Sequence, residues 1–192
     1  MSVGARSASS PARTVKEFVD LAKAKPGEIG FAGSGSGSTP HLAGELFKTQ
    51  TGTKMVHVPY RGTGPAITAI LSGEVGSMFM PALTALPLIQ SGRVRALGVT
   101  SLERLPALPE LPTVSESGLK GYQSSQWYGV LAPAGTSPEI LNLLNGHAVK
   151  IMQSADMKER MKNSGSVAVG SSREVFAKFL QTEYSKWAQV IK

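Results

Sequence analysis

Apolar residues along the chain change repeatedly between two spacings, and the change predicts helices and strands in turn. In residues 14–25 the side chains of Val15, Phe18, Val19 and Ala22 recur at the spacing of one helix face, and proline and glycine follow as a stop signal. Residues 28–32 then predict a short strand. The same reasoning predicts helices over 40–51, 65–71, 81–91, 138–153 and 154–163, and strands over 54–59, 75–80, 95–100, 126–132 and 167–169.

Serine residues mark the expected starts of the later helices. Ser137 precedes Pro138 and is a suitable N-cap, and Ser171 or Ser172 is expected to cap a final helix. That final helix has an apolar stripe that consists of Phe176, Phe179, Leu180, Tyr184, Trp187 and Val190. Residues 104–121, by contrast, predict an extended, ordered loop.

The alternation of strands and helices predicts an α/β fold with mainly parallel strands. We expect a flexible leader over residues 1–12, an α/β domain over 13–124 and a second, incomplete domain over 125–192. Ligands of open parallel sheets bind at the carboxyl ends of the strands. Two glycine-rich loops are expected at such ends, over 34–39 and 61–64.

The loop over 34–39 joins a short apolar strand to a helix and is rich in glycine and serine. Such a junction directs several backbone N–H groups and hydroxyls at one point, where the helix dipole adds positive potential. This predicts a site for an anion, typically a carboxylate or a phosphate. The alternative is a flexible loop without a ligand.

The loop resembles several enzyme signatures, but it lacks residues that each of them requires. The sequence Ser38-Thr39-Pro40 replaces the Gly-Lys-Ser/Thr ending of a nucleotide-binding P-loop, and no serine in the loop has glycine two residues away on both sides. A dinucleotide-binding fingerprint also fits poorly. An enzyme acting on a small anionic substrate would need a general base, and His41 and Glu45 are the candidates.

Single polar residues near the loops allow two interpretations each. His41 at a helix start either caps the helix or touches the ligand. His57 in a strand is expected to be a hydrogen-bonded structural residue, with a catalytic or metal-binding role as the alternative. Arg61 either binds a carboxylate through both of its terminal nitrogens or is an exposed loop arginine.

Composition and charge restrict the classes of function. The 192 residues include no cysteine, which excludes disulfides, thiolate zinc sites and a cysteine nucleophile. The net charge is +7, but the basic residues are dispersed, so no nucleic-acid partner is expected. No stretch is long and apolar enough to span a bilayer, and residues 1–9 lack the apolar core of a signal peptide.

Several motifs in a fixed order resemble one family of transport proteins. They are Gly33-Ser34-Gly35, Pro40-His41-Leu42-Ala43-Gly44-Glu45-Leu46-Phe47, His57-Val58-Pro59-Tyr60-Arg61-Gly62, Leu71-Ser72-Gly73-Glu74-Val75, Gly92-Arg93-Val94-Arg95-Ala96-Leu97-Gly98-Val99-Thr100, Leu111-Pro112-Thr113-Val114-Ser115-Glu116-Ser117-Gly118 and Leu131-Ala132-Pro133-Ala134-Gly135-Thr136. In these motifs the chain resembles the substrate-binding proteins of tripartite tricarboxylate transporters, the Bug or TctC-like family.

The resemblance implies a fold like that of type II periplasmic binding proteins, a two-domain clamshell of which this chain holds one complete domain and part of the other. It also implies a periplasmic, non-catalytic protein without metal or cofactor, which binds a small carboxylate and passes it to membrane permease subunits. The ligand contacts that it implies are Ser34, Gly35, Ser36, Gly37, Ser38, Thr39, His41, Tyr60, Arg61, Gly62, Thr63, Gly64 and Met80.

The chain departs from the family pattern in two ways. It lacks the N-terminal region that family members carry before the helix at Thr14, and Met80 stands where many relatives have aspartate after a strand phenylalanine. The second departure favours a simple carboxylate over an amino acid. The first leaves apolar surface in residues 126–132 and 176–187 without its usual cover, so we expect a homodimer or a domain-swapped assembly through this part. A family remnant with an oligomeric role and little ligand binding is the alternative.

Overall fold

The computed structural model describes residues 2–7 and 11–191. It divides into two compact units, Met1–Gln126 and Trp127–Lys192, which are described here as unit 1 and unit 2. The division falls two residues after the boundary expected at position 124. The expectations for Met1, for residues 8–10 and for the C-terminal residue lie outside the described residues.

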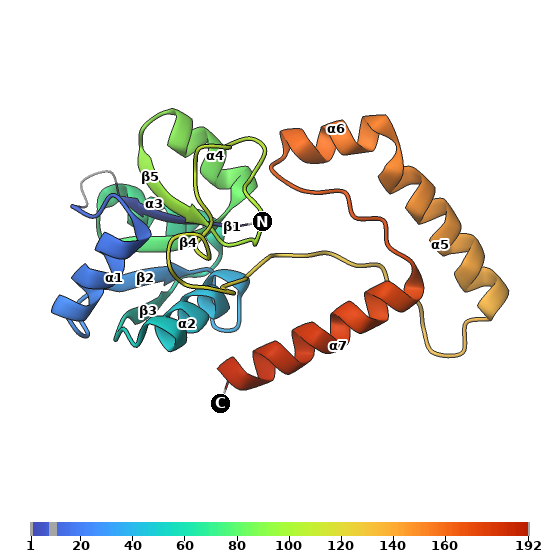
Figure 1. Ribbon diagram of the computed structural model, residues 1–192, viewed down its shortest axis with the longest axis horizontal. Coiled ribbons are helices and arrows are strands. Elements are labelled where there is room, and N and C mark those ends of the chain that lie inside the picture. The colour runs from blue at the N-terminus through green and yellow to red at the C-terminus, as the bar shows by residue number, and fades with distance from the viewer. Residues whose placement is uncertain (1, 8–10, 192) are drawn as a thin grey trace. The chain divides into compact units, whose positions relative to one another are not determined.

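Unit 1 is built on a five-stranded sheet of order β3-β2-β4-β1-β5 (Figure 1). The strands are β1 (Ser2–Ser7), β2 (Gly30–Gly33), β3 (Val56–Pro59), β4 (Ser77–Pro81) and β5 (Val94–Val99). Strand β2 pairs in parallel with β3 and β4, whereas β1 pairs antiparallel with both β4 and β5. The predicted α/β fold is correct, and the sheet is mixed because of this single reversed strand.

The prediction of a flexible leader over residues 1–12 is wrong for the part that the structure describes. Residues Ser2–Ser7 form β1, which lies between two other strands, and Val3 and Ala5 have almost no exposed surface. Ala12 is buried as well. The segment is short and poor in large apolar residues, and only its pairing with β4 and β5 gives it a regular structure.

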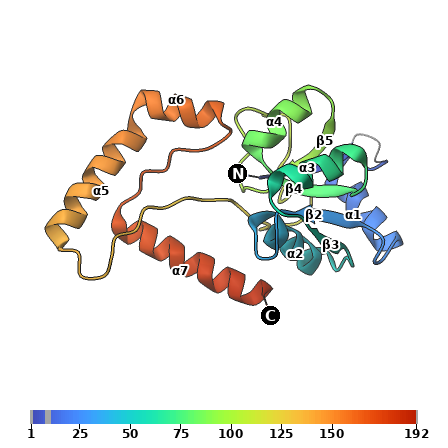
Figure 2. The same ribbon diagram turned by 180° about the vertical axis from the view of Figure 1, so that it is seen from behind.

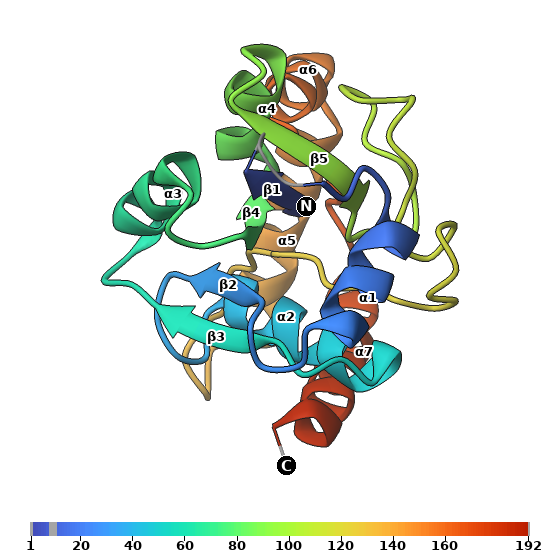
Figure 3. The ribbon, with the colours of Figure 1, turned by 90° about the vertical axis from the view of Figure 1, so that its left-hand side faces the viewer.

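Helices cover both faces of the sheet (Figures 2 and 3). The helices of unit 1 are α1 (Val15–Ala24), α2 (Thr39–Thr51), α3 (Thr63–Ser72) and α4 (Ala82–Gln90). On one face Phe47 of α2 contacts Phe18 of α1 and Phe79 of β4, with ring centroids 5.6 and 5.8 Å apart. On the other face Met78 and Met80 pack with α3 and α4 in the main hydrophobic core. Alternate residues of β4 therefore serve two cores, as the pleat of a strand requires.

Local sequence signals set the ends of these helices. Thr14 caps α1 by accepting a hydrogen bond from the Glu17 backbone N–H. Gly52 and Gly73 end α2 and α3 in the left-handed conformation, with φ of +67° and +81°. The helix predicted from Pro65 begins two residues earlier, at Thr63.

Unit 2 consists of α5 (Pro138–Gln153), α6 (Ala155–Asn163), α7 (Arg173–Val190) and the segments that join them. Ser137, Ser154 and Ser172 cap these helices as N-cap residues. The strands predicted over 126–132 and 167–169 do not form. Both segments have the apolar residues of a strand, but a strand exists only with a neighbour to pair with, and unit 2 has no sheet among its described residues.

No helix among the described residues has the length and apolar character that crossing a membrane requires.

Candidate functional site

The two glycine-rich loops leave the sheet side by side. Gly33 at the end of β2 and Pro59 at the end of β3 are register partners, and the backbone N–H of Tyr60 donates to the carbonyl of Gly33 at 2.9 Å. The loop over 34–38 and the loop over 60–62 thus start from neighbouring points at the carboxyl edge of the parallel strands. The sequence-based placement of both loops at one edge is correct.

The helices that follow these loops begin without side-chain caps. For α2 and α3, as for α4, the structure has no side-chain hydrogen bond to the first backbone N–H groups, whereas α1, α5, α6 and α7 are capped. The Ser38 hydroxyl, which is positioned to cap α2, instead donates to the Gly35 carbonyl at 2.7 Å. Two helix N-termini therefore present free donors and a positive dipole end at this edge.

Glycine is required in both loops by the backbone conformation. Gly35, Gly37 and Gly62 have φ of +121°, +75° and +105°, a region that other residues adopt only under strain. These turns bring the chain from strand to helix within a few residues. The sequence pattern of alternating glycine and serine is thus explained by local geometry, whatever the loop binds.

Behind the first loop lies a stack of three rings. The rings of His41 and His57 are stacked with centroids 3.8 Å apart, and Phe31 lies 5.2 Å from His57. The Nδ1 atom of His41 accepts a hydrogen bond from the Gly37 backbone N–H at 3.0 Å. His41 Nε2 lies 3.7 Å from a Glu45 carboxylate oxygen, and Lys48 pairs with the same carboxylate at 2.8 Å.

His57 is a packing residue without the expected hydrogen bond at Nε2. That atom is buried and has no hydrogen-bond partner. Burial, followed by the neighbouring His41, lowers the pKa of His57 from its usual value, so the ring is neutral in the folded protein near pH 7. The interpretation of His57 as structural agrees with this position, but its stabilisation comes from ring contacts.

The remaining predicted site residues differ in how accessible they are. Ser36, Gly37, Arg61 and Gly64 are exposed, and Ser34, Gly35, Ser38, Thr39, Gly62 and Thr63 are partly exposed. Met80 is completely buried in the hydrophobic core, so its side chain does not reach the surface between the loops. The strand pleat directs Met80 towards α3 and α4, which position in the sequence alone does not reveal.

Tyr60 points its hydroxyl away from the loops. The hydroxyl donates to the Glu74 carboxylate at 2.7 Å, beyond the C-terminal end of α3, and the ring packs against the core. Partial burial and this hydrogen bond raise the pKa of Tyr60 to about 12. Its backbone N–H, bonded to Gly33, is the part of Tyr60 that belongs to the loop edge.

Catalytic or metal chemistry finds little support in this arrangement. Within residues 2–7 and 11–191, no three His, Cys, Asp or Glu side chains are grouped so that they could hold a metal ion. His41 and His57 are stacked face to face, so their ring nitrogens do not converge on one point. The Nδ1 atom of His41 is already occupied by the Gly37 N–H.

Comparison with known proteins gives one consistent family. Residues 2–192 match the family model described as "Tripartite tricarboxylate transporter family receptor". The chain is 37% identical over 185 residues to the Pseudomonas sp. strain P51 "UPF0065 protein in tcbD-tcbE intergenic region", covering 96% of this chain and 55% of that one. It is 36% identical to "Protein BugT" of Bordetella pertussis, covering 88% of this chain and 52% of the relative.

Solved structures agree with the sequence relatives. A structure titled "R. palustris Rpa4515 with adipate" matches with a TM-score of 0.88 and 32% identity, covering 98% of this chain and 63% of that one. "MatC (Rpa3494) from Rhodopseudomonas palustris with bound malate" matches with a TM-score of 0.85 and 28% identity, covering all of this chain and 66% of that one. The chain thus spans about half to two thirds of the length of these relatives.

Proposed function

The chain belongs to the tripartite tricarboxylate transporter receptor family, and from this we propose that unit 1 supplies one side of a binding site for a small carboxylate. Membership confirms the resemblance seen in the sequence motifs and the periplasmic-binding-protein-like α/β fold. The family consists of solute receptors and not of enzymes, in agreement with the failure of each enzyme signature in the glycine-rich loop.

One observation supports a carboxylate most directly. The uncapped N-termini of α2 and α3 follow neighbouring loops, so both direct unpaired donors to the same edge of the sheet. A carboxylate accepts hydrogen bonds only and gains from the dipoles of both helices. Two solved relatives are described with adipate and with bound malate, and both ligands are small molecules with two carboxylate groups.

The proposed contacts are the two loops and not all of the residues expected from the sequence. They lie in the segments 34–39 and 61–64, and they exclude the Gly37 N–H and the Ser38 hydroxyl, which are already bonded to His41 and to the Gly35 carbonyl. Met80 and the Tyr60 hydroxyl are left out, because the first is buried in the core and the second is bound to Glu74. Arg61 is the exposed cation of the second loop.

Calorimetric titration with malate and with adipate tests the proposal. We expect saturable binding that weakens in Arg61→Gln, since the charge-assisted hydrogen bond to a carboxylate is lost. Arg93→Gln removes the same charge at an exposed position before β5, at the opposite edge of the sheet, and is the matched control. Absence of binding across a wider panel of di- and tricarboxylates, or equal weakening in both variants, would contradict the proposal.

For the whole protein we propose a periplasmic receptor that delivers its ligand to the permease subunits of a tripartite tricarboxylate transporter. The support is family membership and similarity to solved relatives, such as "Structure of periplasmic binding protein BugD", which is 30% identical. Ligand-dependent cross-linking between the receptor and membranes that contain the permease is the test. Membranes without the permease subunits are the control, and equal cross-linking in both would contradict the delivery role.

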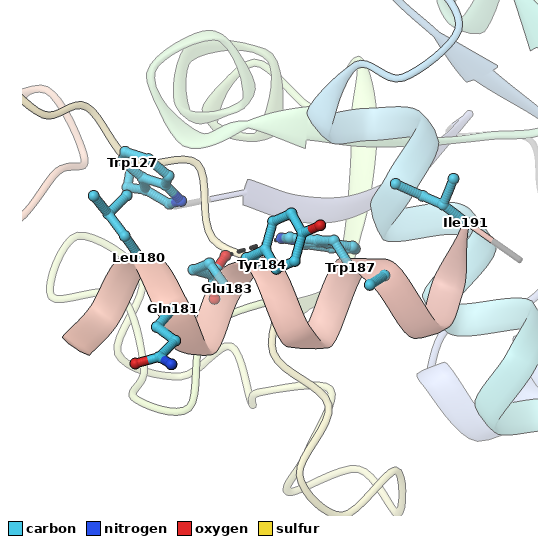
Figure 4. Close-up of a pocket in the computed structure, with 8 residues that line it drawn as sticks. Trp127, Leu180, Gln181, Glu183, Tyr184, Trp187 and Ile191 are labelled. Atoms are coloured by element: carbon cyan, nitrogen blue, oxygen red, sulfur yellow. Dashed lines mark hydrogen bonds between the residues drawn. The ribbon is translucent and has the colours of Figure 1, made fainter. Parts of the chain in front are cut away.

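Unit 2 exposes much apolar surface. The exposed fractions of Tyr128, Val130 and Leu131 are 88, 91 and 75%, and those of Val169 and Tyr184 are 70 and 79%. A groove along α7 is lined by Trp127, Leu180, Glu183, Tyr184, Trp187 and Ile191 (Figure 4). Such a surface indicates an interface.

The one carboxylate in this groove already has its partners. Glu183 accepts a hydrogen bond from Trp187 Nε1 at 2.9 Å and pairs with Lys186, and both partners lie on the same helix. A partner surface that covers the groove therefore needs no positive charge to compensate the Glu183 carboxylate, so an apolar partner surface fits. We propose that a second copy of the chain covers this face.

The mass of the protein in solution by light scattering tests this dimer. A mass of two chains that falls towards one in Trp187→Ala or Tyr184→Lys supports it. A single-chain mass at high concentration would contradict it and would instead favour a cover from additional polypeptide, for which the longer relatives have the length.

A further inference from the structure

The glycine-rich loop is held to α2 by one imidazole nitrogen. Gly37, with φ of +75°, is the turn residue just before the helix, and its backbone N–H donates to His41 Nδ1 at 3.0 Å. Within the loop, the hydroxyl and the backbone N–H of Ser38 both donate to the Gly35 carbonyl, at 2.7 and 3.3 Å. A side chain on the first turn of α2 thus holds the end of the loop that leads into the helix.

This bond requires a particular protonation state of His41. An imidazole nitrogen accepts a hydrogen bond only when it carries no proton, so Nδ1 must be bare and the ring proton must be on Nε2. Nε2 faces Glu45, with 3.7 Å between that nitrogen and a carboxylate oxygen, which favours a proton there. In a doubly protonated His41 the Nδ1–H would face the Gly37 N–H, and two donors cannot form a hydrogen bond.

We propose that His41 is a positioning residue, which holds the loop over 34–38 in its ligand-binding geometry through Nδ1 and does so only while its ring is neutral. Acidification then releases Gly37 from the helix and disorders the free donors of the loop. The inference deepens the proposed function, on which its statement about ligand affinity rests. Its statement about the loop does not depend on any ligand.

The groups around His41 favour this role over a direct ligand contact. Glu45 and Lys48 from α2 and His57 from β3 are the titratable groups that face the ring. His57 is stacked on one face and stays neutral, since burial and His41 lower its pKa. With one ring face covered and Nδ1 and Nε2 directed at Gly37 and Glu45, neither nitrogen is directed at an incoming anion.

Nuclear magnetic resonance of the chain without ligand tests the loop statement. We expect neutral His41 in the Nε2–H tautomer, from the nitrogen shifts of its ring. The amide signal of Gly37 should move with the same midpoint as the His41 ring during a pH titration. His147, exposed on α5, is the internal control, and its titration should leave Gly37 unmoved. A neutral Nδ1–H tautomer, or independent titrations of Gly37 and His41, would overturn the proposal.

Two substitutions at position 41 test whether the hydrogen-bond acceptor, and not merely a side chain of similar size, holds the loop. His41→Asn places an amide oxygen near the site of Nδ1 and cannot titrate, whereas His41→Leu removes the acceptor. We expect the Gly37 amide to remain protected from hydrogen exchange at all pH values between 5 and 8 in the asparagine variant, and to lose protection in the leucine variant. Equal protection in both variants would contradict the role of Nδ1.

Malate and adipate titrations complete the test. Their affinity should fall roughly fivefold in His41→Leu, the factor that corresponds to one hydrogen bond of about 1 kcal/mol, and be retained in His41→Asn. In the wild type the affinity should fall on acidification, whereas a direct contact from a charged histidine would raise it. If the wild type binds neither acid, the proposed function fails for these ligands, and the amide titration still decides the role of His41.

Discussion

The Nε2 atom of His57 lies only 2.2 Å from the position that a β-carbon on Gly33 would occupy. Gly33 is the last residue of β2 and His57 lies on the neighbouring strand β3, so the histidine ring fills the space over the glycine. The two residues form a pair in which the absence of one side chain makes room for the other. The pair lies where β2 ends and the first loop begins.

We expect Gly33→Ala to destabilise unit 1 by about 1–3 kcal/mol, because the new methyl group forces the His57 ring out of its stack. Gly64→Ala is the matched control, since a β-carbon there meets no atom within 4 Å. Its change in unfolding free energy should be within about 0.5 kcal/mol. Urea unfolding of both variants measures the difference, and equal midpoints would show that the ring moves freely.

The buried hydroxyl of Thr100 joins the start of β1 to the end of unit 1. Its Oγ1 lies 3.0 Å from the Ser2 carbonyl and 2.5 Å from the Ser124 carbonyl, and Thr100 has no exposed surface. We expect Thr100→Val, which keeps the shape, to cost about 1–3 kcal/mol of unfolding free energy, because a buried carbonyl loses its donor. Thr49→Val, on an exposed turn of α2, should change it by less than about 0.5 kcal/mol in thermal unfolding.

Tyr60→Phe distinguishes a structural tyrosine from a ligand contact. The variant loses the hydrogen bond to Glu74, so its stability should fall by about 0.5–1.5 kcal/mol, and its affinity for malate or adipate should not change. Glu74→Gln, which keeps an acceptor for the same hydroxyl, should retain more of the stability. A loss of affinity in Tyr60→Phe without loss of stability would place the hydroxyl in the ligand site instead.

The hydrogen bonds of the Glu116 carboxylate are expected to contribute stability that is lost in acid. A hydrogen bond from the Thr113 backbone N–H, at 2.8 Å, and one from Arg104 hold the pKa of Glu116 below its usual value of 4.5. A carboxyl group whose pKa is depressed by folding contributes stability above its unfolded pKa and loses it as the pH falls through the folded value. The stability difference between wild type and Glu116→Gln should therefore be constant from pH 7 to about 5 and shrink below about 4.5.

Chemical unfolding at a series of pH values measures this difference. Glu110→Gln removes the same charge from an exposed position of the same long loop and is the control. A stability difference for Glu116→Gln that grows on acidification would show that the contacts to Thr113 and Arg104 do not favour the ionised carboxylate.

Much of the fold follows from local patterns. The spacing of Val15, Phe18 and Ala22 predicts α1, and the serines at 137 and 172 cap helices as expected, because these signals depend on nearby residues alone. Strand β1 could not be predicted, since its small residues become a strand only between β4 and β5. Residues 126–132 show the opposite case, an apolar run that lacks a neighbouring strand.

The site shows the same limit. Both loops and their shared edge follow from the strand and helix order, but the directions of single side chains do not. Met80 and Tyr60 are among the ligand contacts expected from the sequence, yet the pleat of β4 and the hydrogen bond to Glu74 direct their side chains elsewhere. The bond between His41 and Gly37 depends on a ring orientation that no spacing rule specifies.

The position of β1 between β4 and β5 has a consequence for how the protein is made. Val3 pairs with Met80 on one side and with Val99 on the other, so most of unit 1 separates the strand from its neighbours along the chain. During synthesis β1 leaves the ribosome before either neighbour exists, and the helices that depend on local contacts can form while it waits. The sheet closes only after residue 99 has emerged, so we expect slow folding that is limited by this distant pairing.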